Sequence, residues 1–284
     1  MSGAIHWNPD PEIINLFHTI PLRYYGLLFA TGLVLGYLIV RSMFRKENVP
    51  VEKLDQLAIY IFVGTLVGAR LGHCLFYDFE YYSHHILEIF LPFKINGSDF
   101  QYIGYRGLAS HGGAIGILIA ILVYCKRAKI NLLWILDKVA IATPLTGMFI
   151  RLGNFMNSEI IGKPTNSNYG FIFESEDLLP RHPAQLYEAF AYALIFVVLF
   201  YLYSYKRQSF AKGFLFGLFL VLLFAARFIL EFYKENQEAF EDDLVINMGQ
   251  ILSIPFIIAG IILMYLKRNP ESQHADTGRE IVGE

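Results

Sequence analysis

The chain has 284 residues, of which 55% are hydrophobic, and its mean hydropathy is +0.43. This composition is typical of chains with membrane-spanning helices and argues against a soluble globular domain. The formal net charge of −2 lacks the basic excess of nucleic-acid-binding proteins, so we expect no nucleic-acid partner. The two cysteines, Cys74 and Cys125, have no metal-type spacing around them, and we interpret both as packing residues.

Seven apolar runs are long enough to cross the hydrocarbon core of a bilayer. The N-terminal residues 1–17 precede them without the features of a signal peptide, and we expect an arm outside the membrane. Because only helices satisfy the backbone in lipid at such lengths, the sequence predicts an all-α polytopic membrane protein with about seven transmembrane helices. Without a repeat or a composition break, residues 1–284 are expected to form a single integral membrane domain. The predicted spans are 22–44, 56–77, 108–125, 132–150, 184–204, 213–232 and 247–266.

Lysine and arginine are unequally distributed between the connections. The connections 41–55, 126–131 and 205–212, together with the tail after residue 266, carry 13 of the 23, whereas the opposite side carries seven in longer segments. Because basic residues favour the cytoplasmic side, we expect the N-terminus outside and the C-terminus in the cytoplasm. The two long connections, 78–107 and 151–183, then form outer loops, and we expect chemistry or recognition at this face.

Two arginines lie inside predicted spans, where a charge has either an internal partner or a function. Arg227 precedes Glu231 by four residues, so the two side chains lie on one helix face and are able to pair. Arg70 lies three residues before His73. Two interpretations stay open for each arginine: a structural ion pair, or a guanidinium that faces a cavity and holds an anion such as phosphate.

The end of the fourth span gathers more polar residues than helix capping requires. Arg151, Asn154, Asn157 and Glu159 occur within nine residues, directly after an apolar run. We interpret them as hydrogen-bonding groups that line a cavity on the outer side. A solvated helix end is the alternative.

Three further patches also lie towards the predicted outer side. His111 occupies a glycine-rich helix entry, where a neutral imidazole can act as a base, although a capping or packing role is the alternative. Tyr24 and Tyr25 begin the first span as interfacial anchors or ligand contacts. Gln185 and Glu188 lie one turn apart at the start of the fifth span, and we expect them to face the bundle interior.

The sequence resembles the prolipoprotein diacylglyceryl transferase family along nearly its whole length, in order from about residue 21 to 266. The most specific match is RLGNFMNSEIIG at 151–162. The others are YYGLLFATG at 24–32, GARLGHCLFYD at 68–78, SHGGAIG at 110–116, RHPAQLYEA at 181–189, RFILEF at 227–232 and MGQILSIP at 248–255. The chain departs from the family pattern at Ile150, at Leu223 and at Lys234-Glu235-Asn236-Gln237.

The resemblance implies transfer of a diacylglyceryl group from phosphatidylglycerol to the lipobox cysteine of a prolipoprotein signal peptide, with release of glycerol phosphate. It places the enzyme among the lipids of the bacterial cytoplasmic (inner) membrane, with its active site towards the outer face, and implies no metal or redox cofactor. The implied catalytic residues are His111 as base, Tyr25, Arg151 and Arg227. The implied substrate-binding residues are Arg151, Asn154, Asn157, Glu159, Gly162, Arg227 and Glu231, and the supporting residues are Arg70, Gln185 and Glu188.

Two other function classes remain open from the residues alone. A transporter or channel also accommodates intramembrane arginine and histidine, but such proteins often contain internal repeats, and none is found here. A scaffold that binds lipid or peptide without chemistry is the second. Transfer of labelled lipid to a peptide thiol distinguishes the enzyme from both.

Overall fold

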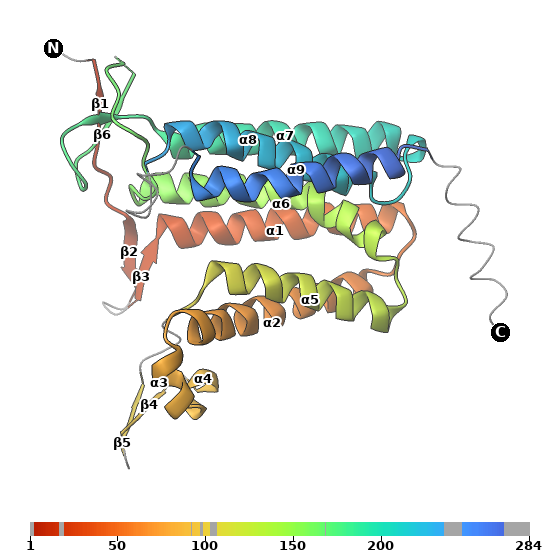
Figure 1. Cartoon of the computed structure of the whole chain (residues 1–284), viewed down its shortest axis with the longest axis horizontal. Helices are drawn as coiled ribbons and strands as arrows, with labels where there is room; N and C mark the ends of the chain where they lie inside the picture. The colour runs from red at the N-terminus through yellow and green to blue at the C-terminus, as the bar shows by residue number, and fades with distance from the viewer. Residues whose placement is uncertain are drawn as a thin grey trace. The chain divides into compact units, whose positions relative to one another are not determined.

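The computed structural model describes residues 3–16, 20–91, 93–96, 99–102, 107–167, 169–235 and 246–269. Seven helices among these residues are long and apolar enough to cross a membrane, so the prediction of an all-α polytopic membrane protein is confirmed. They are α1 (Tyr24–Lys46), α2 (Val51–Phe76), α5 (Ser110–Ala128), α6 (Leu132–Met156), α7 (Ala184–Lys206), α8 (Phe214–Leu230) and α9 (Met248–Leu266), labelled in Figure 1.

The helix bounds differ from the predicted spans where polar residues continue a helix. Helix α6 runs to Met156 rather than ending at residue 150, so the first residues of the predicted outer loop 151–183 are helical. The predicted loop 78–107 contains α3 (Phe79–His84), α4 (Leu87–Phe90), β4 (Phe93–Asn96) and β5 (Asp99–Tyr102), while its residues 92, 97–98 and 103–106 lie outside the described residues. Hydropathy locates a span, but helical hydrogen bonding continues past its apolar part.

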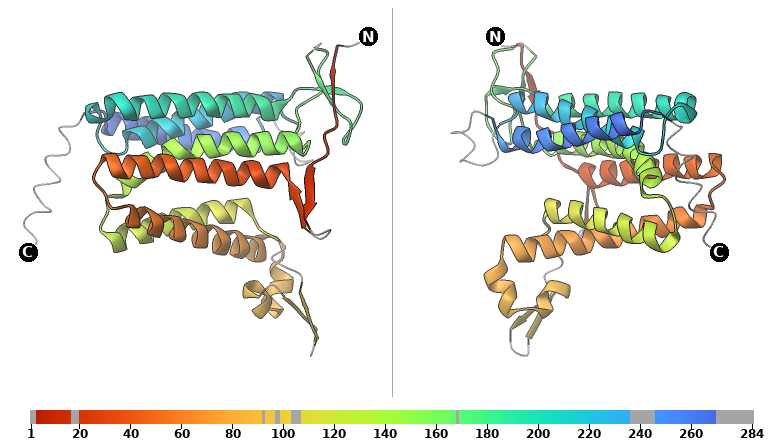
Figure 2. Two further views of the ribbon diagram at one scale, coloured as in Figure 1. Left: turned by 180° about the vertical axis from the view of Figure 1, so that it is seen from behind. Right: turned by 45° about the vertical axis from the view of Figure 1, so that its right-hand side comes forward.

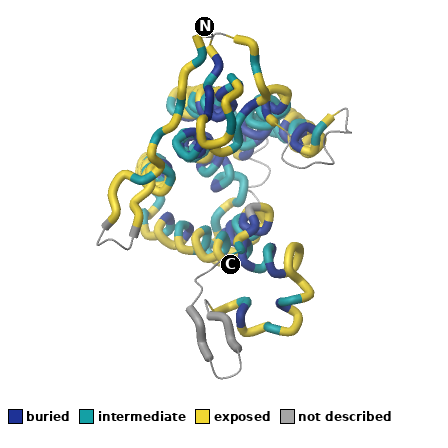
Figure 3. The backbone as a smooth tube through the Cα atoms, turned by 90° about the vertical axis from the view of Figure 1, so that its left-hand side faces the viewer, coloured by how far each residue is buried: buried dark blue, intermediate teal, exposed yellow. Residues whose placement is uncertain are grey.

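The chain divides into two compact units, and each is described by itself. The first unit contains Met1–Ser42 and Leu136–Glu284, and the second contains Met43–Ile135. The single membrane domain expected over residues 1–284 stays a prediction. In both units, exposed residues are abundant on the outward sides of the helices (Figure 3), which suits helices whose apolar faces meet lipid.

Helices of the first unit approach one another at glycines. A Cβ atom on Gly32 of α1 would lie 3.0 Å from Phe149 of α6, and the Thr146 hydroxyl donates to the Gly32 carbonyl at 3.1 Å. Helices α8 and α9 meet in the same way at Gly217 and Gly260. Close approach at small residues increases van der Waals contact, which drives helix association in lipid.

The carboxylate of Asp137 in α6 caps the N-terminus of α8. It accepts hydrogen bonds from the backbone N–H groups of Gly213 at 2.7 Å and Phe216 at 2.8 Å. These two donors have no partner within their own helix, and the carboxylate also suits the positive end of the helix dipole. The bond therefore fixes α8 to α6 at the helix ends opposite to those that carry the polar cluster described below.

Short strands, which the sequence analysis did not predict, accompany the helices. In the first unit, β1 (Ile5–Trp7) pairs in parallel with β6 (Phe171–Phe173), β6 pairs antiparallel with β7 (Pro180–Arg181), and β2 (Glu12–Leu16) pairs antiparallel with β3 (Ile20–Arg23). Trp7 donates from Nε1 to the Phe155 carbonyl at 3.0 Å, and the two rings lie 4.2 Å apart. The N-terminal arm is thus anchored to the end of α6.

In the second unit, α2 packs antiparallel against α5 through glycines (Figure 2). A Cβ atom on Gly68 would lie 2.4 Å from the Gly112 carbonyl oxygen, and one on Gly64 would lie 2.7 Å from the Gly116 carbonyl oxygen. No side chain fits at these positions without displacing backbone. The repeated four-residue spacing of glycine on both helices thus produces one continuous line of backbone contact.

Candidate functional site

Arg151 and Glu188 form a buried ion pair between α6 and α7. Arg151 Nε lies 2.8 Å from Glu188 Oε2, and the two side chains are 15% and 2% exposed. That carboxylate oxygen makes no aligned hydrogen bond within the described residues, so the contact is electrostatic. A carboxylate this deeply buried needs a nearby cation, because an unpaired charge in such surroundings is strongly unfavourable. The arginine of the 151–162 motif and the glutamate of the 181–189 motif therefore belong to one site.

Lys234 supplies a second cation to the same glutamate. Its Nζ lies 3.7 Å from Glu188 Oε1 and 3.5 Å from Glu231 Oε2, and its side chain is 4% exposed. A β-bridge between Gly162 and Lys234 holds its backbone in place. In the sequence, Lys234 stands out only as a departure from the family pattern, and this role was not predicted. Of the remaining departures in this run, Asn236 and Gln237 lie outside the described residues.

Of the two interpretations open for Arg227, the ion pair with Glu231 is not formed. Glu231 is the C-cap of α8, and its N–H donates to the Arg227 carbonyl, but in the 3-10 turn that follows, η2 (Glu231–Tyr233), its side chain lies against Lys234. Among the described residues, the ion-pair partner of Glu231 is Lys234, and no carboxylate lies within ion-pair distance of Arg227. Arg227 is close to the cluster nonetheless, because Tyr192 of α7 lies within electrostatic reach of both Arg151 and Arg227.

A chain of amide hydrogen bonds extends from Arg151 to the end of α6. Arg151 Nη1 donates to Asn154 Oδ1 at 3.1 Å, and Asn154 Nδ2 donates to Glu159 Oε2 at 2.9 Å. Asn157 Nδ2 donates to Glu159 Oε1 at 3.2 Å, and Gln185 Nε2 donates to the Glu159 backbone carbonyl at 2.7 Å. The polar residues that the sequence placed at the end of the fourth span thus form one network, with Glu159 at its centre.

The backbone after α6 adopts a left-handed conformation twice. Ser158 and Ile160 have φ of 56°, a region that is uncommon for residues other than glycine and unusual for a β-branched one. The turn brings the Glu159 N–H to the Asn154 carbonyl at 2.9 Å. Local strain persists only where surrounding contacts fix it, and it is common at functional sites. Here it orients the Glu159 side chain back towards Asn154 and Asn157.

Gly162 lies where two other segments leave no room for a side chain. A Cβ atom there would lie 2.4 Å from the His182 carbonyl oxygen and 2.7 Å from the Tyr233 carbonyl oxygen. The close approach allows the Gly162 N–H to donate to the His182 carbonyl at 3.0 Å. Gly162 therefore joins the segments that carry Glu159, Gln185 and Lys234, which gives it a positioning role.

Arg181 fixes the loop beside this junction. Its guanidinium donates to the Asp177 carboxylate, to the Gly162 carbonyl and to Glu235, and its side chain is 8% exposed. The hydrogen bond from Arg181 lowers the pKa of Asp177, and the reciprocal contact raises the pKa of Arg181. The loop therefore carries its own ion-pair cluster outside the spans.

Tyr25 reaches the same end of α6 from α1. A Cβ atom on Gly153 would lie 2.8 Å from the Tyr25 ring, so the ring packs on the helix where a side chain is missing. Gly153 lies between Arg151 and Asn154 in sequence. The structure therefore brings together Tyr25, Arg151, Asn154, Asn157, Glu159, Gly162, Gln185, Glu188 and Glu231 in the first unit, with Arg227 close by.

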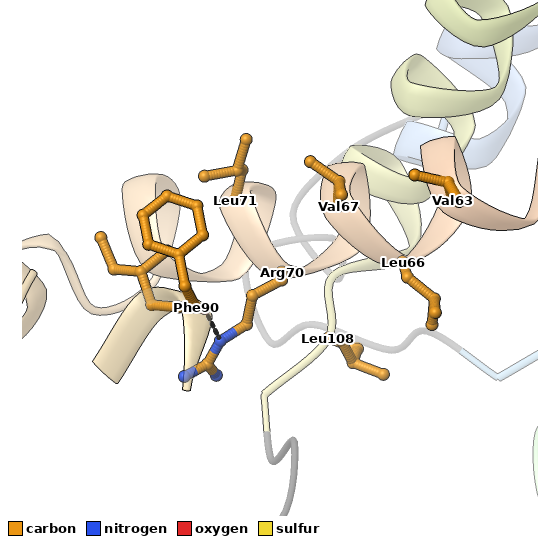
Figure 4. Close-up of a pocket in the computed structure, with 8 residues that line it drawn as sticks. Val63, Leu66, Val67, Arg70, Leu71, Phe90 and Leu108 are labelled. Atoms are coloured by element: carbon orange, nitrogen blue, oxygen red, sulfur yellow. Dashed lines mark hydrogen bonds between the residues drawn. The ribbon is translucent and has the colours of Figure 1, made fainter. Parts of the chain in front are cut away.

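Arg70 lies in the second unit and donates hydrogen bonds to the backbone around it (Figure 4). It donates from Nε to the Ile89 carbonyl at 3.0 Å and from Nη2 to the Glu88 carbonyl at 2.6 Å, and its guanidinium lies 4.9 Å from the Tyr82 ring centroid. The side chain borders an apolar pocket of about 310 Å³ beside Leu66 and Phe90. These contacts join α2 to the α4 region and favour a supporting role.

His111 also belongs to the second unit, on the first turn of α5. Its side chain is exposed, and no hydrogen bond or ion pair of His111 is found among the described residues. An exposed imidazole without a partner is available to a substrate, but the contacts within its unit assign it no role. In the described part of the chain, no group of three or more His, Cys, Asp or Glu residues has the arrangement of a metal site.

Comparisons with known proteins give a consistent result. The family model described as prolipoprotein diacylglyceryl transferase matches residues 11–266. A phosphatidylglycerol–prolipoprotein diacylglyceryl transferase of Bacteroides fragilis is 50% identical over 263 residues, covering 92% of this chain and 95% of the relative. Enzymes of the same name from Tolumonas auensis and Chloroherpeton thalassium are 50% and 41% identical, covering 95% and 93% of this chain and 100% and 94% of the relatives.

Proposed function

The chain belongs to the prolipoprotein diacylglyceryl transferase family, and we propose that it transfers the diacylglyceryl group of phosphatidylglycerol to the lipobox cysteine thiol of a prolipoprotein. The observation that carries the proposal is the buried cluster of Arg151, Glu188 and Glu231, which lies within the segments that resemble the family, together with Lys234. The two cations of this cluster are matched by two carboxylates, and Arg227 beside it, without a carboxylate at ion-pair distance among the described residues, suits an anionic lipid headgroup.

The donor enters from the membrane that the protein spans. We place the enzyme in the bacterial cytoplasmic membrane with the site towards the outer face. The cluster lies at the end of α6, the start of α7 and the end of α8, and the distribution of lysine and arginine predicts all three on the outside. The second substrate, a prolipoprotein signal peptide with its lipobox cysteine, is expected at the same face.

The arginines stabilise the departing phosphate. Arg227 has no carboxylate at ion-pair distance among the described residues, so its charge is available to the lipid phosphate. Arg151 contacts Glu188 through Nε and Asn154 through Nη1, and the two contacts fix the orientation of its guanidinium. Preorganised cations of this kind act most strongly where charge develops, here on the oxygen that leaves with glycerol phosphate.

The proposed transfer needs no reactant other than the lipid and the peptide thiol. The cysteine sulfur attacks the diacylglycerol carbon that carries the phosphate oxygen, a C–S bond forms, and the C–O bond breaks with its electron pair on the leaving glycerol phosphate. The thiol proton passes to a base, since the thiolate is the nucleophile. We assign the base to His111, which is exposed on the first turn of α5, and headgroup orientation to Tyr25.

Purified protein in vesicles that contain labelled phosphatidylglycerol tests the proposal when a lipobox peptide is added. We expect label on the peptide thiol, loss of transfer in Arg151→Ala and Arg227→Ala, and normal transfer in the matched control Arg268→Ala, whose side chain lies exposed beside Tyr265 at the end of α9. Absence of label with the unaltered protein would rule out the enzyme and favour a transporter or a lipid-binding scaffold. Near-normal rates in His111→Gln would remove His111 from the mechanism.

A further inference from the structure

Gln185 is entirely buried at the start of α7, yet only one end of its amide has a partner. The side chain is 0% exposed, and its Nε2 donates to the Glu159 backbone carbonyl at 2.7 Å. Its Oε1 has no hydrogen-bond donor within the described residues. Buried amide oxygens without a donor are rare, so each one calls for a ligand or a bound water.

The orientation of this amide is determined by its neighbour. Rotating it by 180° would place two carbonyl oxygens 2.7 Å apart, which is repulsive, so Nε2 faces Glu159 and Oε1 faces away. Asn157 repeats the arrangement at the side chain of Glu159. Its Nδ2 donates to Glu159 Oε1 at 3.2 Å, and its buried Oδ1 has no donor in the described part of the chain. Two oriented acceptors therefore lie around a single glutamate.

The surroundings determine what kind of donor fits. Glu159 is joined through Asn154 to Arg151, and Arg151 lies beside Glu188, which Lys234 also approaches. Arg151 and Lys234 are each paired with a carboxylate, whereas Arg227, close to Arg151, has no carboxylate at ion-pair distance among the described residues and favours a ligand that carries an anion. Neutral hydroxyl groups on a phosphate ester satisfy both conditions, because the phosphate meets Arg227 and the hydroxyls donate to the amide oxygens.

We propose that Gln185 Oε1, together with Asn157 Oδ1, forms a hydroxyl-recognition subsite for the polyol headgroup of the donor lipid. This inference rests on the proposed function, and it changes Gln185 from a supporting residue to one that determines headgroup specificity. Phosphatidylglycerol carries two free hydroxyls in its headgroup, whereas phosphatidylpropanol carries none. The subsite therefore predicts that the enzyme distinguishes two lipids that differ only in these hydroxyls.

The test compares kcat/KM for the two lipids with the same peptide acceptor. In the unaltered protein, leaving buried acceptors unpaired is expected to lower kcat/KM for phosphatidylpropanol by about 5- to 150-fold. In Gln185→Met the ratio between the lipids should fall at least about fivefold. Gln250→Met is the matched control, because Gln250 is also buried but both ends of its amide have backbone partners. The control should keep the original ratio.

The outcomes distinguish failure of the hydroxyl-recognition subsite from failure of the proposed function. Transfer from both lipids within about twofold by the unaltered protein means that water satisfies the amides, and it overturns the subsite while the proposed function stands. An unchanged ratio in Gln185→Met overturns the role of Gln185. No transfer from either lipid overturns the proposed function itself. The comparison in the unaltered protein decides the hydroxyl preference even if Gln185→Met does not fold.

Discussion

Replacement of Lys234 by methionine removes the cation that lies between two buried carboxylates. Methionine has a similar length and no charge, so the substitution changes electrostatics more than packing. Glu188 keeps Arg151 at 2.8 Å, whereas Glu231 loses its ion-pair partner among the described residues. The cost therefore falls mainly on Glu231, which is 7% exposed.

The distances determine the expected size of the effect. Nζ lies 3.5 Å from one carboxylate and 3.7 Å from the other, which corresponds to an attraction of about 4 to 5 kcal/mol each at an effective dielectric constant of about 20. Part of this lost attraction is offset, because the methionine variant avoids the cost of removing an ammonium group from water. Removing one partner of a buried pair typically destabilises a protein by about 3 to 5 kcal/mol, and we expect about 3 kcal/mol here because the contacts are long.

Thermal unfolding in detergent measures the loss, with Lys212→Met as the matched control at an exposed lysine. The double variant Lys234→Met with Glu231→Gln should be more stable than Lys234→Met alone, because it also removes the unpaired charge. If Lys234→Met unfolds at the same temperature as the control, the lysine does not stabilise the two carboxylates.

Three further predictions concern glycines and the outer loop. Gly68→Ala should destabilise the protein by about 3 kcal/mol in thermal unfolding, because its Cβ would lie 2.4 Å from a carbonyl oxygen of α5, whereas Gly26→Ala, with nothing within 4 Å, should be neutral or stabilising. Gly162→Ala should abolish transfer in the labelled-lipid assay, because its Cβ would lie 2.4 Å from a loop carbonyl oxygen, and normal turnover would contradict the positioning role. Because Arg181 lowers the pKa of Asp177, this carboxylate stabilises the fold above the unfolded-state pKa near 3.8, and the contribution is lost as pH falls through the lower folded-state value. Asp177→Asn should therefore be less stable than the unaltered protein at pH 7, and the difference should disappear as pH falls through the folded-state pKa of Asp177; a constant difference would contradict the assignment.

The helices were predictable from sequence because one physical requirement determines them. A backbone in lipid must satisfy its own hydrogen bonds over about 20 residues, so apolar runs specify the spans without knowledge of tertiary contacts. The polar residues after the fourth span were predictable for the same reason, since Arg151, Asn154 and Glu159 have no place in an apolar run unless they meet a partner. The small sheets were not predictable, because their pairing depends on segments as distant as Ile5 and Phe171.

The pairing of the charges required the structure because it depends on which of two nearby cations each carboxylate contacts. Helical spacing relates Arg227 to Glu231, and the Glu231 N–H does donate to the Arg227 carbonyl, but spacing alone does not show which cation the carboxylate contacts. The 3-10 turn brings Glu231 to Lys234, three residues further on, and the bridge to Gly162 holds that lysine inside the cluster. Arg227 is consequently left without a carboxylate among the described residues. The contact of Glu231 with Lys234 thus separates the cation that holds the protein's own carboxylates from the cation that is available to a lipid phosphate.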